Sequence, residues 1–131
     1  MSAEYQYYKD GNFPVPMQIF SLDLKPGELA VYCYLLNRMD WKTRTCYPSL
    51  TTIAKAVGCT KTTAEKYVKL LEQKELIYTQ HSEVKTEKHG VRNGNLIYTV
   101  RPIEDAIRAR IRRQEEENRK RYVQEQLQLP A

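Results

Sequence analysis

Residues 47–77 read YPSLTTIAKAVGCTKTTAEKYVKLLEQKELI, and this stretch decides the fold. Ser49 stands where its side chain can accept a hydrogen bond from a free backbone N–H at the start of a helix. The residues after it that share one helical face predict the buried side of that helix: Leu50, Ile53, Ala54 and Val57. Gly58 suits the left-handed residue that ends a helix. The stretch therefore predicts a short helix that ends at Gly58.

A second helix follows after a turn of only Gly58 and Cys59, and Thr60 is placed to cap its start. One side of this helix is apolar and the other is polar. The apolar side carries Ala64, Tyr67, Val68 and Leu71, and the polar side carries Thr62, Lys66, Lys69 and Gln73. Ala54 is small where the two helices are expected to cross closely. The spacing predicts a tight helix pair with one face buried and one exposed.

The segment before this pair predicts an arm, a strand and a first helix. Residues 1–16 contain two prolines close together, so we expect an extended arm. Its tyrosines, Tyr5, Tyr7 and Tyr8, are interpreted as a DNA contact, as a dimer contact or as part of a flexible arm. Residues 17–20 are expected to form a short strand. Pro26 fits the first turn of a helix that should end near Trp41.

The segment after the pair predicts a hairpin and a last helix. Residues 76–82 and 96–101 are rich in β-forming side chains, and the polar tip expected between them contains the turn-forming pair Asn93-Gly94. From residue 103 to about Leu127 a charged helix is predicted. It is interpreted either as a solvated linker or as a dimer contact through one stripe, Ile103, Ile107 and Ile111.

Three short helices, a tight turn and a hairpin resemble the winged helix-turn-helix family over about residues 20–101. The resemblance implies a mainly α fold with a small β-hairpin: a three-helix core, a wing and a C-terminal helix. The expected division is an arm at 1–16, the winged domain at 17–101 and the charged helix at 102–131. The chain departs from the family at Ala64, where a larger branched residue is usual, and at Glu75, where glycine is usual. If position 75 must be left-handed, the glutamate costs about 1 kcal/mol.

The same resemblance implies a partner, double-stranded DNA, whose major groove receives the second helix of the pair. Lys66 is expected to reach a guanine edge and Glu65 a cytosine amine, while phosphates meet the helix starts and the wing. The expected contact residues are Ser49, Thr51, Thr52, Thr60, Lys61, Thr62, Thr63, Glu65, Lys66, Lys69, Lys85, Lys88, His89, Arg92 and Asn93.

A closer resemblance is to the N-terminal domains of replication initiators and replisome organisers of Gram-positive plasmids, phages and mobile elements. It rests on residues 13–20, 24–32 and 46–50, which read FPVPMQIF, LKPGELAVY and CYPSL. It implies a homodimer on repeated origin sequences and replication proteins as further partners. Two alternatives stay open: a small transcriptional regulator of the same fold, and a winged helix that holds proteins instead of DNA.

Charge and composition narrow the function classes. Residues 42–100 carry 10 basic and 5 acidic side chains, so the net +5 of the chain lies where the helix pair and wing are predicted. No stretch is apolar enough for a membrane span or an export signal, and we expect a cytoplasmic protein. Three cysteines without a C-x-x-C pair predict free thiols. We find no nucleophile–base set, phosphate loop or metal spacing, and expect neither catalysis nor a metal or cofactor.

Overall fold

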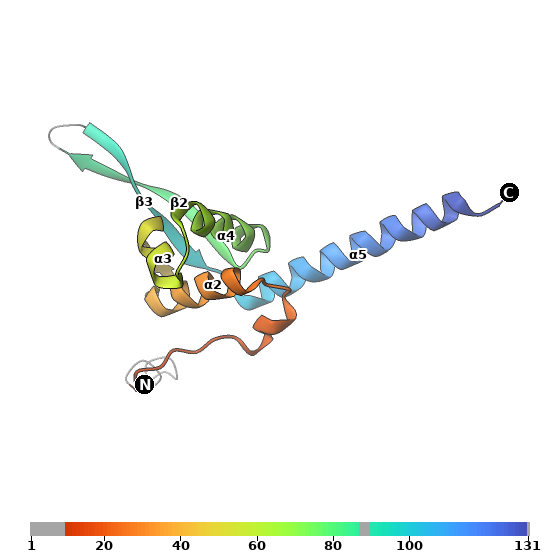
Figure 1. Cartoon of the computed structure of the whole chain (residues 1–131), viewed down its shortest axis with the longest axis horizontal. Coiled ribbons are helices and arrows are strands. Elements are labelled where there is room, and N and C mark those ends of the chain that lie inside the picture. Colours follow the sequence, from red (N-terminus) through yellow and green to blue (C-terminus); the bar gives the residue numbers. More distant parts are fainter. Residues whose placement is uncertain (1–9, 87–89, 131) are drawn as a thin grey trace.

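The computed structural model describes residues 10–86 and 90–130, and within 83–94 the backbone alone (Figure 1). Its fold is a winged helix-turn-helix, as expected. The elements in chain order are η1 (Met17–Ser21), α2 (Pro26–Arg38), β1 (Thr45–Cys46), α3 (Leu50–Val57), α4 (Lys61–Gln73), β2 (Ile77–Thr86), β3 (Gly90–Val100) and α5 (Ile103–Gln128). The strands form one antiparallel sheet in the order β1-β3-β2.

The helix pair α3 and α4 has the predicted ends. Ser49 Oγ accepts a hydrogen bond from the Thr52 amide at 3.1 Å, and Thr60 Oγ1 accepts one from the Thr63 amide at 3.1 Å. Gly58 is left-handed, with φ 77° and ψ 40°. Each cap satisfies one of the amides that a helix start leaves free, which is worth about 1 kcal/mol.

The core lies between α2, the helix pair and the base of the sheet. Its largest fully buried side chains include Tyr32, Leu35, Ile53, Leu71 and Tyr98. Burying a side chain of this size stabilises the fold by about 1.5–3 kcal/mol, so these few positions supply much of the driving force. Burial also raises the pKa of Tyr98 to about 12, because the ionised phenol would be desolvated.

Helices α2 and α4 approach closely where the side chain of Tyr67 covers Gly27. A Cβ added at Gly27 would lie 2.0 Å from Cζ of Tyr67. Ala54 is buried too, as expected of a small residue in α3. The sequence pattern did not reveal Gly27 because a glycine after a proline at a helix start reads as a turn signal.

Two predictions about the N-terminal part were wrong. Residues 17–21 form a 3₁₀ helix, not a strand: Pro16 starts a turn in which the Ile19 amide donates to the Pro16 carbonyl at 3.1 Å. Ile19 is buried while Met17 and Phe20 are 94% and 84% exposed, so a single side chain anchors the segment. Helix α2 ends at Arg38, before Trp41, because the Asp40 amide donates to the Thr45 carbonyl and turns the chain into β1.

The sheet differs from the prediction in length and in number of strands. Strands β2 and β3 continue to the pair Thr86 and Gly90, so Asn93-Gly94 lies inside β3 and is not the turn. His81 pairs with Leu96 whereas Glu83 pairs with Asn93, so the register shifts between these two pairs. An irregularity of this kind tolerates turn-forming residues such as Asn93-Gly94 inside a strand. Strand β1, which was not predicted, pairs with Tyr98 and Thr99. Two residues are too few to show a period.

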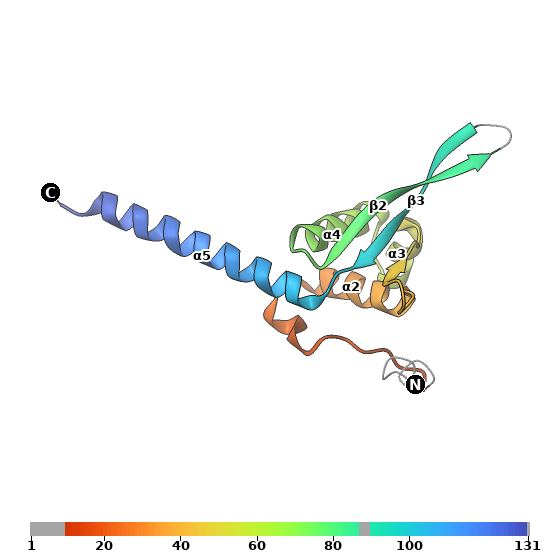
Figure 2. The same ribbon diagram turned by 180° about the vertical axis from the view of Figure 1, so that it is seen from behind.

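Helix α5 leaves the domain as a long arm (Figure 2). Ala106 and Ala109 are buried at its root, and every residue from 111 to 128 is exposed. Ile103 and Ile107 pack against the core of their own chain, which leaves Ile111, 49% exposed, as the available part of the predicted dimer stripe. Within the described residues, no helix is long and apolar enough to cross a membrane.

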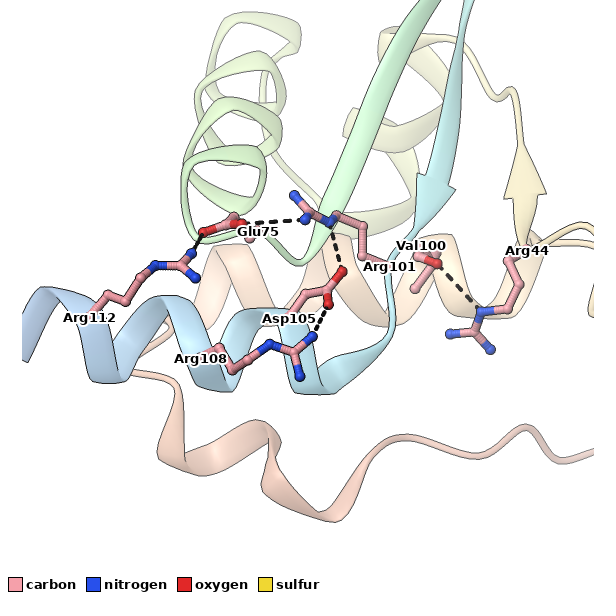
Figure 3. A network of polar contacts seen from close by, with 7 residues as sticks. All are labelled: Arg44, Glu75, Val100, Arg101, Asp105, Arg108 and Arg112. Carbon is pink, nitrogen blue, oxygen red and sulfur yellow. Dashed lines mark hydrogen bonds and ion pairs between the residues drawn. The ribbon is translucent and has the colours of Figure 1, made fainter.

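The root of α5 is held by carboxylates from two left-handed residues. Glu75 has φ 61° and its carboxylate pairs with Arg112 at 2.5 Å and with Arg101 at 3.3 Å (Figure 3). Asp23 has φ 60° and pairs with Arg110 at 2.8 Å. Position 75 is therefore left-handed even without glycine, and the side chain that glycine would lack joins the end of α4 to α5.

A third left-handed residue fastens the end of the sheet. Arg44 has φ 62°; its carbonyl accepts from the Val100 amide at 2.8 Å, and its Nε donates to the Val100 carbonyl at 3.4 Å (Figure 3). Its guanidinium lies 5.7 Å from the centroid of the Trp41 ring. This residue fixes β1 against β3 just before the chain enters α5.

Candidate nucleic-acid interface

Helix α4 presents the expected polar side to solvent. Thr62, Lys66 and Lys69 are exposed, whereas Ala64 and Leu71 on the opposite side are fully buried. A shallow depression of about 350 Å³ runs along the exposed side, lined by Thr62, Glu65, Lys66, Lys69, Leu70 and Gln73. No part of the described chain covers this side, so an incoming ligand can approach it directly.

The charges on this side are not equivalent. Lys69 Nζ lies 3.4 Å from the Glu65 carboxylate, in an exposed pair four residues apart on the helix. Lys61 and Lys66 make no ion pair within the described residues. Lys66 is therefore the unneutralised cation near the middle of the α4 surface, while Glu65 and Lys69 are partly compensated before any partner arrives.

The threonines and serine at the two helix starts divide into structural and available groups. Thr60 Oγ1 donates to Thr63 Oγ1 at 2.9 Å while it accepts the Thr63 amide, and Thr63 is half-buried. Ser49 and Thr52 share a hydrogen bond of 2.8 Å between their hydroxyls. Thr51 is exposed, with no hydrogen bond from its hydroxyl in the described part of the chain. Thr60 thus acts first as a cap, and Thr51 keeps its hydroxyl for another molecule.

A second depression, of about 410 Å³, lies where α3, α4 and the base of the wing meet. It brings together four of the predicted residues, Ser49, Thr51, Lys61 and Glu65, and adds His81, Asn95, Leu96 and Tyr98 from the strands together with Pro48 and Leu50. The Asn95 side chain donates to the Tyr47 carbonyl at 3.3 Å, which ties the wing base to the approach to α3.

Sequence reasoning missed His81 and Asn95 as neighbours of this site. Their position depends on the pairing of His81 with Leu96 and on the register shift beyond it, and neither feature leaves a local pattern. A third hollow, of about 690 Å³, shares Pro48, Ser49 and Asn95 with the second and reaches Arg38 at the end of α2. Arg38 is a cation at this border that was likewise not predicted.

The predicted wing contacts lie mostly outside what the structure describes. Lys85 lies in β2 and Arg92 and Asn93 lie in β3, but only their backbone is described. Lys88 and His89 fall outside the described residues. The described parts of β2 and β3 extend beyond the helix pair (Figure 1). The DNA contacts of the five wing residues remain a prediction.

The cysteines do not form a reactive cluster. Burial raises the pKa of the Cys46 thiol to about 11 and also raises that of Cys33, because the thiolate would lose its hydration. Cys46 Sγ donates weakly to the Leu35 carbonyl at 3.8 Å. Within the described part of the chain, no three histidine, cysteine or acidic side chains gather where they could hold a metal ion.

Residues 22–77 match the model of a family described as a helix-turn-helix domain. The matched segment runs from just before α2 to the first residue of β2, and it therefore contains the helix pair and its exposed side. No curated protein matches the chain in sequence.

Among solved structures, the chain is similar to one from Methanosarcina mazei Go1 named "Possible transcriptional regulator", with 23% identity, 86% of this chain and 84% of that chain covered and a TM-score of 0.49. It is also similar to MepR of S. aureus in a DNA complex (16% identity, 94% and 88% covered, TM-score 0.43). A third is the YusO protein of Bacillus subtilis (16% identity, 87% and 81% covered, TM-score 0.44). At these identities the similarity concerns the chain fold.

Proposed function

We propose that this chain binds double-stranded DNA by placing α4 in the major groove. The single observation that carries the proposal is the exposed side of α4, on which Lys66 has no ion pair and no cover from the residues that the structure describes, while the opposite side is buried in the core. A helix with its side chains is about 10–12 Å across, and the major groove of B-DNA is about 12 Å wide. No catalytic step is part of the proposal.

The residues of the interface take different roles in this proposal. Lys66 donates to a base edge, guanine being the base that offers two acceptors in the major groove. Glu65 accepts a hydrogen bond from a cytosine amine, and its ion pair with Lys69 holds the Lys69 ammonium group beside the same contact. Thr51 and Lys61 border the depression at the wing base, where a DNA phosphate can meet the start of α3. The wing residues Lys85, Lys88, His89, Arg92 and Asn93 contact the flanking backbone.

Salt dependence is the first test, because phosphate contacts release counterions. Fluorescence anisotropy with a random-sequence duplex should show binding at low salt that weakens steeply as salt is added. Lys61→Ala should lower the slope of log affinity against log salt by about 1, as the loss of one phosphate contact predicts. Lys25→Ala is a matched control. Lys25 is exposed and stands just before α2, where its backbone amide donates to Glu28. Glu28 pairs with Lys74 just after α4, at the opposite end of that helix from Lys61. Absence of binding at micromolar protein and low salt would favour a protein-binding module instead.

The cellular role is a separate part of the proposal. The Methanosarcina structure named "Possible transcriptional regulator" agrees with the transcriptional-regulator alternative, and none of these three similar structures is named as a replication initiator. We therefore state the role as regulation of transcription, with replication initiation and its partner proteins as the competing role. Selection of bound sequences from a random duplex library separates them: a single palindrome fits a regulator, and directly repeated sites fit an initiator.

A further inference from the structure

The far half of α5 is an exposed helix of opposite charges. Every residue from 111 to 128 is exposed. Beyond Arg112, which pairs with Glu75, Figures 1 and 2 both show the helix extending away from the rest of the described chain. A helix that buries no face gains stability from side-chain pairs along its surface or from a partner. The question is which of the two its sequence fits.

The charges of this segment are ordered about one residue. Residues 115–117 are all glutamate, residue 118 is asparagine, and residues 119–121 read Arg-Lys-Arg. Read outward from Asn118, each acidic position on one side has a basic position at the same distance on the other. Rotating the segment by 180° about Asn118 therefore exchanges acidic positions with basic ones. An ordinary solvated helix does not require this symmetry.

Ion pairs within one helix account for only part of this pattern. Glutamate four residues before a basic residue is a favourable pair on a helix, and the segment offers three such pairs. The structure forms one of them, Glu116 with Lys120 at 3.5 Å. Glu115, Glu117, Arg119 and Arg121 make no ion pair within the described residues. Four charges are thus left for another molecule.

We infer that α5 pairs side by side with α5 of a second copy of this chain, antiparallel and centred on Asn118. In that arrangement residues 115–117 of one copy lie beside 119–121 of the other, so acid meets base along both flanks. A parallel pair in register would set the glutamates of one copy beside the glutamates of the other. Charge order of this kind selects orientation and partner more than it adds affinity, because exposed ion pairs are individually weak.

Apolar side chains on the same side of α5 fit this arrangement. Ile111 lies seven residues before Asn118 and Tyr122 four residues after it, spacings that place all three on one side of a helix. Ile111 is 49% exposed and Tyr122 is 62% exposed. In the antiparallel pair, Ile111 of one copy falls within one helical turn of Tyr122 of the other. This contact lies beyond Ile103 and Ile107, which are already used within the chain.

Analytical ultracentrifugation of the full chain without DNA tests the pairing, so that its outcome is independent of the proposed function. The wild type should dimerise reversibly at low salt below about 100 µM chain, and the dimer should weaken with added salt. Glu115→Arg/Glu117→Arg should weaken the dimer by at least about tenfold, because like charges then lie side by side. Adding Arg119→Glu/Arg121→Glu to the same chain restores opposite charges and should return the dimer to within about threefold of the wild type.

Mixing the wild type with this four-substitution variant reports the orientation. An antiparallel pair sets like charges together in the mixed dimer, so each protein should pair with itself. Circular dichroism confirms that the helix content of every variant is retained. The inference is overturned if the wild type stays monomeric over the whole range, if the two-substitution variant dimerises like the wild type, if the four-substitution variant does not recover, or if mixed dimers predominate.

Discussion

The ends of α3 and α4 solve the same geometrical problem with different residues. Both helices are followed by a left-handed residue, Gly58 with φ 77° after α3 and Glu75 with φ 61° just after α4. A Cβ added at Gly58 would meet nothing within 4 Å, so this turn depends on backbone freedom alone. At the end of α4, Lys74 and Glu75 carry ion pairs to Glu28, Arg101 and Arg112.

The difference shows what a glutamate in a glycine conformation supplies. Between α3 and α4 the chain needs only a tight turn, because the two helices already pack against each other. After α4 the chain must fix the relative orientation of α4, the wing and α5. The ion pairs of Lys74 and Glu75 contribute to this orientation. We therefore expect substitutions at the end of α4 to act through charges, and at the end of α3 through backbone strain. The predictions below follow in order of expected size.

Lys74→Ala should have the largest effect. Lys74 Nζ lies 2.8 Å from the carboxylate of Glu28, which is fully buried, and also donates to the Asp23 carbonyl at 3.1 Å. Removing the cation leaves the buried Glu28 carboxylate without its ion-pair partner, with the Lys25 amide still donating to it, which costs about 3 kcal/mol of the free energy of unfolding. Urea denaturation measures the loss. The control is Lys69→Ala, which breaks an exposed pair and should cost less than about 0.5 kcal/mol. Equal losses in the two variants would show that the Glu28 pair has no special weight.

Gly58→Ala should be next in size. The new methyl group meets no neighbour, so the whole cost is the left-handed conformation, about 1 kcal/mol. Thermal and urea unfolding measure the change, with Ala56→Gly as a comparison for glycine inside α3. A loss near zero would mean that the turn relaxes to another conformation, and the tight connection between the helices would then not depend on glycine.

Substitutions of Glu75 sharpen the comparison most finely. Glu75→Gly relieves about 1 kcal/mol of backbone strain and loses ion pairs worth a similar amount, so the free energy of unfolding should change by less than about 0.5 kcal/mol. Glu75→Ala keeps the strain and loses the pairs, and should be about 1 kcal/mol less stable than Glu75→Gly. If the glycine variant is instead clearly more stable than the wild type, the ion pairs to α5 contribute nothing measurable.

Sequence reasoning found the parts of the fold that local patterns control. The caps at Ser49 and Thr60, the turn at Gly58 and the two sides of α4 follow from residues within one helical turn of each other. It did not find strand β1 or the place of Asn93-Gly94, because those depend on pairing with distant residues. It also missed the 3₁₀ turn at 17–21, which is local but is anchored by the burial of Ile19 in the core. The requirement for a left-handed residue at position 75 was considered from the family pattern, but its ion pairs to α5 came only from the structure.

The candidate site shows the same division. The exposed residues of α4 were predicted from helical spacing alone, whereas His81 and Asn95 entered through strand register and Arg38 through the tertiary fold. Spacing also cannot reveal which cations are already paired. Lys66 and Lys69 look alike in the sequence, and only the structure shows that Lys69 is held by Glu65. The DNA contacts themselves stay a prediction.

The most direct test of the α4 interface is the effect of Lys66→Ala on two affinities, for a duplex carrying the selected sequence and for a random duplex, at the same salt concentration. Loss of a base contact should weaken the selected site by about 1–3 kcal/mol, roughly 5- to 150-fold, and the random duplex by much less. Equal weakening on both duplexes, or none on either, would contradict the assignment of α4 as the helix that reads the DNA sequence.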